Sequence, residues 1–174
     1  MGKKTDYIDQ HYPVMSYNYL VTIYDRNYII QNRSADGKKN AKTLSFSEVT
    51  GLTREYETVI YKHGFSFLMG YFIIPSELKP IQLTLKRGVC DINNDAKYLS
   101  DWFESMDKFP AGIRIPTRNV DISLMKNGEP LVTWKLIGAV PVKLSAPDFV
   151  AGSGQAAIES LELIAKDLEI DYGS

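Results

Sequence analysis

The side chains that could carry out chemistry are few and scattered along the chain. His11 and His63 are the only histidines, and they lie far apart in the sequence and in different contexts. This spacing argues against a histidine-based triad and against a multi-histidine metal site. Cys90 is the single cysteine, which excludes an internal disulfide and a cysteine zinc cage and fits folding in a reducing compartment. We interpret all three residues as ordinary packing or surface residues.

Carboxylates are plentiful, but no motif organises them. The sequence contains no Glu-x-x-His pair, no Asp-x-Asp loop of the calcium type and no Gly-Lys-Ser phosphate loop. We therefore predict no catalytic residue, no cofactor and no metal site, and we expect that the protein is not an enzyme.

One stretch matches a nucleotide-binding pattern. Residues 152–157, GSGQAA, fit G-x-G-x-x-A and lead into the segment Gln155–Leu168, which has helical spacing. In a dinucleotide-binding fold, the N–H groups of such a helix would hold a pyrophosphate. The chain ends at Ser174, which leaves no room for the second parallel strand with its ribose-binding acid. We favour a flexible Gly/Ser/Ala loop, and a nucleotide-dependent enzyme is an alternative that a dinucleotide titration would test.

Length and composition favour a single folded domain. The chain has 174 residues, of which 44% are hydrophobic, enough for a real core. A formal net charge of -1 gives no overall basic field that would attract nucleic acid. The polar start and the short longest apolar run predict neither a signal peptide nor a membrane span.

The elements that would position any site are mostly strands, and the clearest of them form a hairpin at Arg118–Lys143. Apolar and polar residues alternate on both sides of Asn127-Gly128, the pattern of two strands with one wet face each. A two-residue turn would place the two apolar faces on opposite sides, so we predict an odd-length loop with Gly128 left-handed and Pro130 at its edge. The predicted cross-strand pairs are Leu124–Val132, Ile122–Trp134 and Val120–Leu136.

Further strands and one helix are predicted around this hairpin. The helix starts at Asn93, Asn94 or Asp95, and its apolar stripe would cover one face or the open end of a sheet. The tail Gln155–Leu168 gives conflicting signals, and its pattern alone favours a second helix. The predicted strands lie at Tyr17–Ile23, Leu44–Val49, Arg54–Lys62 and Ile81–Leu85, and the stripe of the first helix comprises Leu99, Trp102, Phe103 and Met106. We expect a bulge at Gly138 and a sheet edge at Pro141.

The run Phe65–Ile74, FSFLMGYFII, is apolar on both faces of any strand that it forms. A free hairpin in water would not tolerate this, so something must cover both sides. The cover comes either from the chain's own core or from a neighbouring subunit. The 11 tyrosines also suit a surface that becomes buried on assembly.

Several segments, taken in order along the chain, resemble one family. The segments are Phe46–Leu52, Leu83–Gly88, Trp102 in a short helix, Asp121-Ile122 with Gly128–Pro130, Ala139–Lys143 and Ala157–Leu163. By their order and spacing the sequence resembles the inner tube proteins of contractile injection systems, which include contractile phage tail tubes, pyocin tubes and extracellular toxin-delivery particles. The resemblance runs from about Tyr17 to Leu168. The motif residues that we single out for packing are Gly51, Leu52, Lys86, Arg87, Gly88, Trp102, Trp134, Pro141 and Glu159.

The resemblance implies a mainly β fold, an antiparallel β-sandwich or barrel with one short packed helix. Residues 17–174 would form a single tail-tube-like domain after a flexible arm at residues 1–16, with residues 25–43 as an inserted loop or hairpin. Six copies would form a ring, and stacked rings would form a hollow tube with a continuous lumenal β-barrel. In the family Ile158–Leu163 is a strand, so the resemblance overrides the helical pattern of the tail.

The implied function is mechanical. The tube is a rigid conduit that sheath contraction drives through a target envelope. Expected partners are other copies of the chain, a sheath protein, a spike or baseplate hub, and a tape-measure protein or cargo in the lumen, with nucleic acid only in a phage tail. The protein would be made in the bacterial cytoplasm and become part of a phage tail or of a released or anchored injection particle.

Two groups of charged residues are candidate contact residues. The insertion Asp25–Thr43 is longer than the resemblance leads us to expect, and its basic cluster is either a solvated charge run or a contact to another ring or partner. The second reading would make the chain a specialised tube-initiating ring that joins the tube to the spike or baseplate. The basic cluster is Arg33, Lys38, Lys39 and Lys42, and the residues predicted to face the lumen are Arg54, Glu55, Glu57 and Lys62.

An alternative of another class is a monomeric β-barrel module. It would bind a small ligand between helix and sheet, in a pocket lined by Trp102, Phe103 and Trp134. Ligand-dependent stabilisation would distinguish it from a tube subunit.

Overall fold

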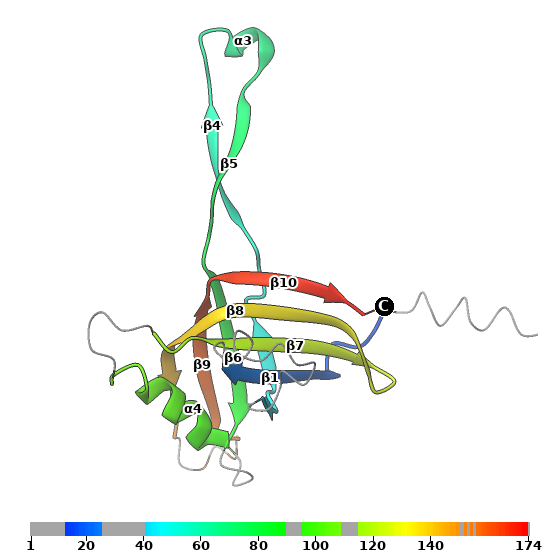
Figure 1. Cartoon of the computed structure of the whole chain (residues 1–174), viewed down its shortest axis with the longest axis vertical. Coiled ribbons are helices and arrows are strands. Elements are labelled where there is room, and N and C mark those ends of the chain that lie inside the picture. The colour runs from blue at the N-terminus through cyan, green and yellow to red at the C-terminus, as the bar shows by residue number, and fades with distance from the viewer. Residues whose placement is uncertain are drawn as a thin grey trace, which may run out of the picture.

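The strands of the protein make up most of its structure, with one short helix packed against them (Figure 1). The computed structural model describes residues 13–25, 41–89, 95–108, 115–149, 152, 154 and 156–173. The elements in chain order are β1 (Tyr19–Asp25), β2 (Lys42–Leu44), β3 (Glu48–Thr50), β4 (Tyr56–Tyr61), α3 (Ser66–Met69), β5 (Phe72–Leu78), β6 (Ile81–Gly88), α4 (Asp95–Glu104), β7 (Arg118–Lys126), β8 (Glu129–Ser145), β9 (Ile158–Ala165) and β10 (Asp167–Tyr172).

The main sheet runs in the order β2-β1-β7-β8-β9-β6-β3, with β10 also paired to β8, and all pairs are antiparallel. Strand β8 divides this path into two layers, because it pairs with β10 up to Ile137, with β7 up to Ala139 and with β9 from Val140 onward. The mainly β, antiparallel prediction is confirmed. Within the described residues the path has two ends, β2 and β3, and is not a closed barrel.

The core lies between the two layers and is closed at one end by α4. Alternate residues of β1, β6 and β9 point inward, which is why those strands have a period of two, and β7 adds Val120 and Ile122 to the same core. Helix α4 adds Leu99 and Trp102, which are 1% and 0% exposed, and the Trp102 indole N–H donates to the Pro116 carbonyl at 3.5 Å. The inward strand residues include Val21, Ile23, Leu83, Leu85, Val120, Ile122, Leu136, Leu161 and Leu163.

The β7–β8 hairpin has the three predicted cross-strand pairs, including Ile122 opposite Trp134. The predicted odd-length loop is wrong, because Asn127 and Gly128 form a two-residue turn with φ of 53° and 88°. The register shifts between Leu124 and Met125, which leaves Leu131 as the extra residue of a bulge. This bulge brings both apolar faces to the same side.

A second bulge in β8 lies at Gly138, as predicted. The register shifts between Arg118 and Val120, and Gly138 has a φ of 67°. The freed N–H of Gly138 donates to the buried Asn119 Oδ1 at 3.0 Å. Pro141 follows in the part of β8 that pairs only with β9 among the described strands, which fits the predicted edge.

The tail is a strand, as the family resemblance implied, and the helix favoured by its pattern is wrong. Strand β9 lies between β6 and β8, and it buries Leu161, Leu163 and Ala165 on one face. Pairing on both sides overrides the helix propensity of its Ala, Glu and Leu residues. The segment predicted as one strand at Leu44–Val49 is likewise divided, between β2 and β3.

Gly51, one of the motif residues, is held where no side chain fits. Its φ is +95°, and an added Cβ would lie 2.0 Å from the Gln82 carbonyl oxygen. We predict that Gly51→Ala lowers the free energy of unfolding by at least about 2 kcal/mol, from backbone strain plus the displacement of β6. Chemical denaturation measures this.

Gly88→Ala is the matched control, because an added Cβ there meets nothing within 4 Å. It should change stability far less than Gly51→Ala. Equal effects of the two substitutions would contradict the steric explanation.

Candidate assembly surfaces

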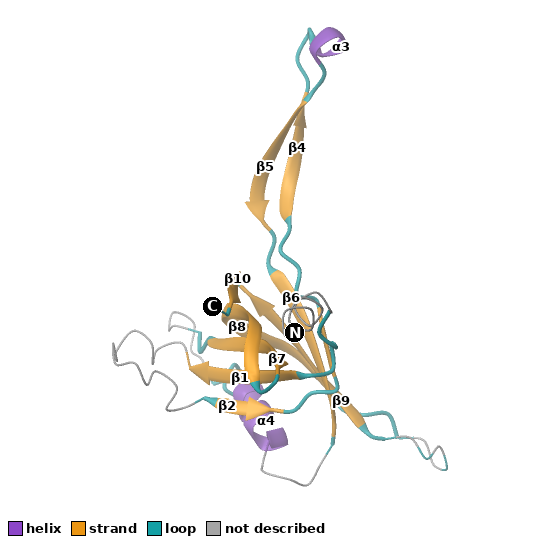
Figure 2. Ribbon diagram, turned by 90° about the vertical axis from the view of Figure 1, so that its right-hand side faces the viewer, coloured by secondary structure: helices purple, strands orange, loops and turns teal. Residues whose placement is uncertain are grey.

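The hairpin of β4 and β5 stands away from the body as an arm, which we define as residues 56–78 (Figures 1 and 2). Its strands form a separate two-stranded sheet, with Val59 opposite Ile74 and Tyr61 opposite Phe72. The short helix α3 lies at its tip. The strand predicted at Arg54–Lys62 is thereby confirmed as β4.

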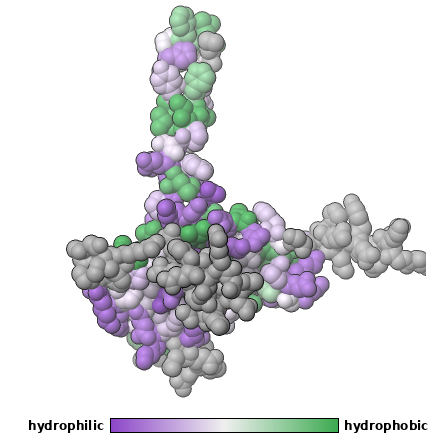
Figure 3. Space-filling view, viewed as in Figure 1, coloured by the Kyte–Doolittle hydropathy of each residue, from purple (hydrophilic) through white to green (hydrophobic). Residues whose placement is uncertain are grey.

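The arm exposes large apolar side chains along its whole length. Figure 3 shows hydrophobic residues gathered on it, and exposure ranges from 48% at Tyr56 to 80% at Phe67. The chain's own core therefore does not cover the run Phe65–Ile74, which removes one of the two explanations that the sequence left open. The exposed residues are Tyr56, Val59, Ile60, Tyr61, Phe65, Phe67, Leu68, Tyr71, Phe72, Ile73 and Ile74.

Polar contacts fasten the base of the arm. The Lys79 ammonium lies 2.6 Å from Glu55 Oε1, and the Lys79 backbone N–H donates to the Glu55 carbonyl at 2.9 Å. The hydrogen bond that the Lys79 ammonium donates to the Glu55 carboxylate raises the pKa of Lys79. Arg54 reaches Asp167 at the start of β10, at 3.5 Å. Of the residues predicted to face a lumen, Arg54 and Glu55 thus make these contacts, while Glu57 and Lys62 are exposed in and next to β4.

An apolar opening on the body, which we call the Trp134 cleft, lies between the layers. Its volume is about 380 Å³, and the polar residues Ser16, Ser47 and Glu48 line its margin. Trp102 does not line it, because that indole is 0% exposed in the core. The structure therefore does not bring Trp102 and Trp134 together in one ligand pocket. The apolar lining consists of Val14, Tyr19, Val49, Leu52, Ile122, Leu124 and Trp134.

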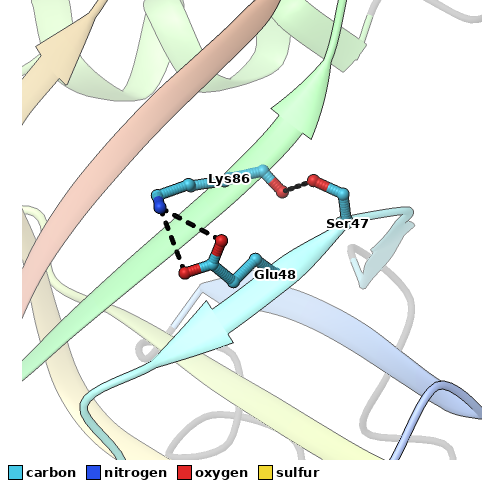
Figure 4. A network of polar contacts seen from close by, with 3 residues as sticks. All are labelled: Ser47, Glu48 and Lys86. Atoms are coloured by element: carbon cyan, nitrogen blue, oxygen red, sulfur yellow. Dashed lines mark hydrogen bonds and ion pairs between the residues drawn. The ribbon is translucent and has the colours of Figure 1, made fainter.

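A polar network beside the cleft ties β3 to β6 (Figure 4). The Lys86 ammonium lies 3.1 and 3.0 Å from the two Glu48 carboxylate oxygens, and the Ser47 hydroxyl donates to the Lys86 carbonyl at 3.0 Å. The Tyr19 hydroxyl donates to the Phe46 carbonyl at 2.7 Å. These contacts hold the margin of the cleft in place, which gives motif residue Lys86 a structural role.

Arg87 and Glu159 form a buried ion pair between β6 and β9. Arg87 Nε lies 2.8 Å from Glu159 Oε1, and the two side chains are 5% and 17% exposed. The contact lacks hydrogen-bond geometry, so Nε, Nη1 and Oε1 have no hydrogen-bond partner among the described residues. Two motif residues are thus paired across the sheet at a desolvated position, where loss of either one leaves a buried charge.

The described end of the insertion packs on helix α4. Lys42 lies 2.9 Å from the Asp95 carboxylate, and its ammonium is 5.1 Å from the centre of the Tyr98 ring. Arg118 lies over the same ring at 4.5 Å and binds Asp25 at 3.0 Å. Lys42 therefore has contacts within its own chain. Arg33, Lys38 and Lys39 lie outside the described residues.

The residues considered for chemistry do not converge. No group of metal-binding side chains occurs within the described part of the chain, and none of its helices is long and apolar enough to cross a membrane. The stretch Gly152–Ala157 leads into strand β9 instead of a helix. His63 lies in the arm, with its ring centre 6.3 Å from that of Tyr61 and 5.8 Å from that of Phe72, while His11 and Cys90 are outside the described residues.

Comparison with known families decides the identity of this fold. The family model described as T4-like virus tail tube protein gp19 matches residues 15–169. The chain belongs to this tail tube family. The family resemblance drawn from the sequence motifs is confirmed, and the family is one of structural tube proteins.

Solved structures share the fold of this tail tube protein. A chain of the PVC sheath-tube complex of an extracellular contractile injection system is 24% identical with a TM-score of 0.74, covering 97% of this chain and 98% of that chain. A chain of the anti-feeding prophage tube-terminating cap is 24% identical with a TM-score of 0.71, covering 99% and 100%. A chain of the anti-feeding prophage baseplate is 24% identical with a TM-score of 0.73, covering 92% and 97%. No curated protein sequence matches the chain.

The buried pair makes a stability prediction. Arg87→Leu should lower the free energy of unfolding by about 3–5 kcal/mol, because it leaves the Glu159 carboxylate buried and unpaired. The double variant Arg87→Leu/Glu159→Leu should recover most of the loss, since it removes both charges. Chemical denaturation of the single and double variants measures both effects.

Lys86→Ala is the control for the buried pair. It breaks the exposed Lys86–Glu48 pair, whose side chains are 41% and 47% exposed, and should cost no more than about 1 kcal/mol. If the double variant is as unstable as Arg87→Leu, the loss of stability comes from losing the ion pair and not from leaving Glu159 as an unpaired buried charge.

Proposed function

We propose that the protein forms hexameric rings that stack into the rigid inner tube of a contractile injection system. The tube is surrounded by a sheath, ends on a spike or baseplate hub, and holds a tape-measure protein or cargo in its lumen. In this assembly strands of adjacent copies join into a continuous lumenal barrel, which pairs the sheet edges that a single chain leaves open. The protein is made in the cytoplasm and acts in the particle.

The observation that carries the proposal is the uncovered arm. The 11 exposed apolar residues of the arm named above are each half exposed or more, apart from Tyr56 at 48%. At roughly 150–250 Å² for a buried aromatic ring, their exposed area is on the order of 1,000 Å², more than the few hundred Å² of ordinary monomer patches. Such an area matches the roughly 800 Å² that each partner contributes to a stable interface. Other copies of the chain supply the cover in a tube.

The charged residues at and near the arm fit the same assembly. Glu57 and Lys62 carry charge among the apolar residues of the hairpin, and we place them on the lumen side with Arg54 and Glu55. A contact of the basic part of the insertion, Arg33, Lys38 and Lys39, with the next ring, the sheath or the spike complex would instead make the chain the specialised tube-initiating ring.

The test is the oligomeric state across a concentration series, measured by mass photometry with negative-stain electron microscopy. Rings of six and stacked rings are expected. Replacing the cross-strand pair Ile60 and Ile73 by serine should raise the concentration for half-assembly at least about tenfold, which corresponds to about 1.4 kcal/mol of lost interface energy. Because both side chains are exposed in the monomer, its circular dichroism and melting temperature should stay nearly unchanged.

The matched control replaces Val142 and Ile158, which are each 46% exposed on the body, by serine. It should assemble like the unmodified chain. A protein that remains monomeric at every concentration, with an intact fold, would overturn the proposal.

A further inference from the structure

We propose that the tip of the arm of one copy occupies the Trp134 cleft of the next copy. The tip is the exposed apolar group of Phe65, Phe67 and Leu68, and the cleft is the apolar opening lined by Trp134 and its neighbours. This inference rests on the proposed ring and adds which surface receives the arm.

The two surfaces match in size. The tip presents two aromatic rings, Phe65 and Phe67, stacked with centroids 6.4 Å apart and with side chains 64% and 80% exposed. The cleft has a volume of about 380 Å³. A cavity of roughly 150 Å³ holds one benzene ring, so the cleft has room for two rings.

The two surfaces also match in chemistry. The floor of the cleft is made by Ile122, Leu124 and Trp134, which present carbon atoms to an incoming ring. Glu48, at the margin, is half exposed while it holds Lys86. Lys62, beside the tip, is exposed and carries the opposite charge. An apolar centre with a charged margin is the usual composition of a protein interface.

The placement of the two surfaces favours a repeating contact. Tip and cleft are different surfaces, so a contact between them is head-to-tail and generates a ring or a stack instead of a closed pair. Leu52, in the cleft wall, lies in the connection that leads from β3 into β4 at the base of the arm. Each tip would therefore dock close to the base of the next arm, and one contact would repeat through the assembly.

The experiment is thiol cross-linking between two variants in a Cys90→Ser background. Chains with Phe67→Cys are mixed with mass-tagged chains with Leu124→Cys, assembled, and treated with a short bis-maleimide reagent. A cross-linked dimer of mixed mass is expected, at least tenfold more abundant than in the control. The control pairs Phe67→Cys with Val142→Cys, because Val142 is an exposed apolar residue outside the cleft.

The assembly state, read on the same samples, separates this inference from the proposed function. Rings without the mixed dimer would overturn the docking of the tip in the cleft and leave the tube function standing. A mixed dimer no more abundant than in the control would do the same. Monomers without cross-links, with the fold intact by circular dichroism, would contradict both proposals.

The fluorescence of Trp134 provides a second reading that needs no cysteine. Trp102 is already buried, so a shift of tryptophan emission to shorter wavelength on assembly would report the cleft. The shift should disappear when Phe67 and Leu68 are replaced by serine in assembled protein. A shift that persists in that variant would show that something other than the tip covers Trp134.

Discussion

Strand β8 has to serve two layers of sheet, and the rest of the fold is arranged around that constraint. It pairs with β10 up to Ile137, with β7 up to Ala139 and with β9 from Val140. An ordinary flat strand would not bend between layers, and the bulge at Gly138 supplies the bend because its positive φ suits glycine. Asn119 accepts the N–H that the bulge frees. The two layers can therefore face each other and share one core.

The chain has two groups of apolar residues, one buried in the core and one exposed on the arm. Inward residues of the layers are almost fully buried, whereas every residue of β4 is exposed. A two-stranded hairpin alone is marginally stable in water, and the contacts of Glu55 and Lys79 hold only its base. The order of the arm and the assembly of the tube are thus linked, because the same neighbouring copies would stabilise both.

Alternation of apolar and polar residues along the sequence predicted the strands of the body. The features that it did not predict depend on contacts between segments far apart in the sequence. The alternation of apolar and polar residues predicted the Ile122–Trp134 pair but not the bulge at Leu131. A two-residue turn alone would put the apolar faces of the two strands on opposite sides of the sheet, and the extra residue at Leu131 brings them to the same side. The tail residues Leu161 and Leu163 also fit a helix, and only pairing on both sides selects the strand. The Trp134 cleft could not be predicted, because its walls come from distant segments.

Hydrogen exchange at the amides of β4 and β5 tests whether other copies cover the arm. We expect fast exchange in dilute monomer and strong protection in assembled protein, while β6 and β9, which lie in the body sheet, are protected in both states. Arm amides that exchange equally fast in rings and in monomers would show that other copies leave the arm uncovered.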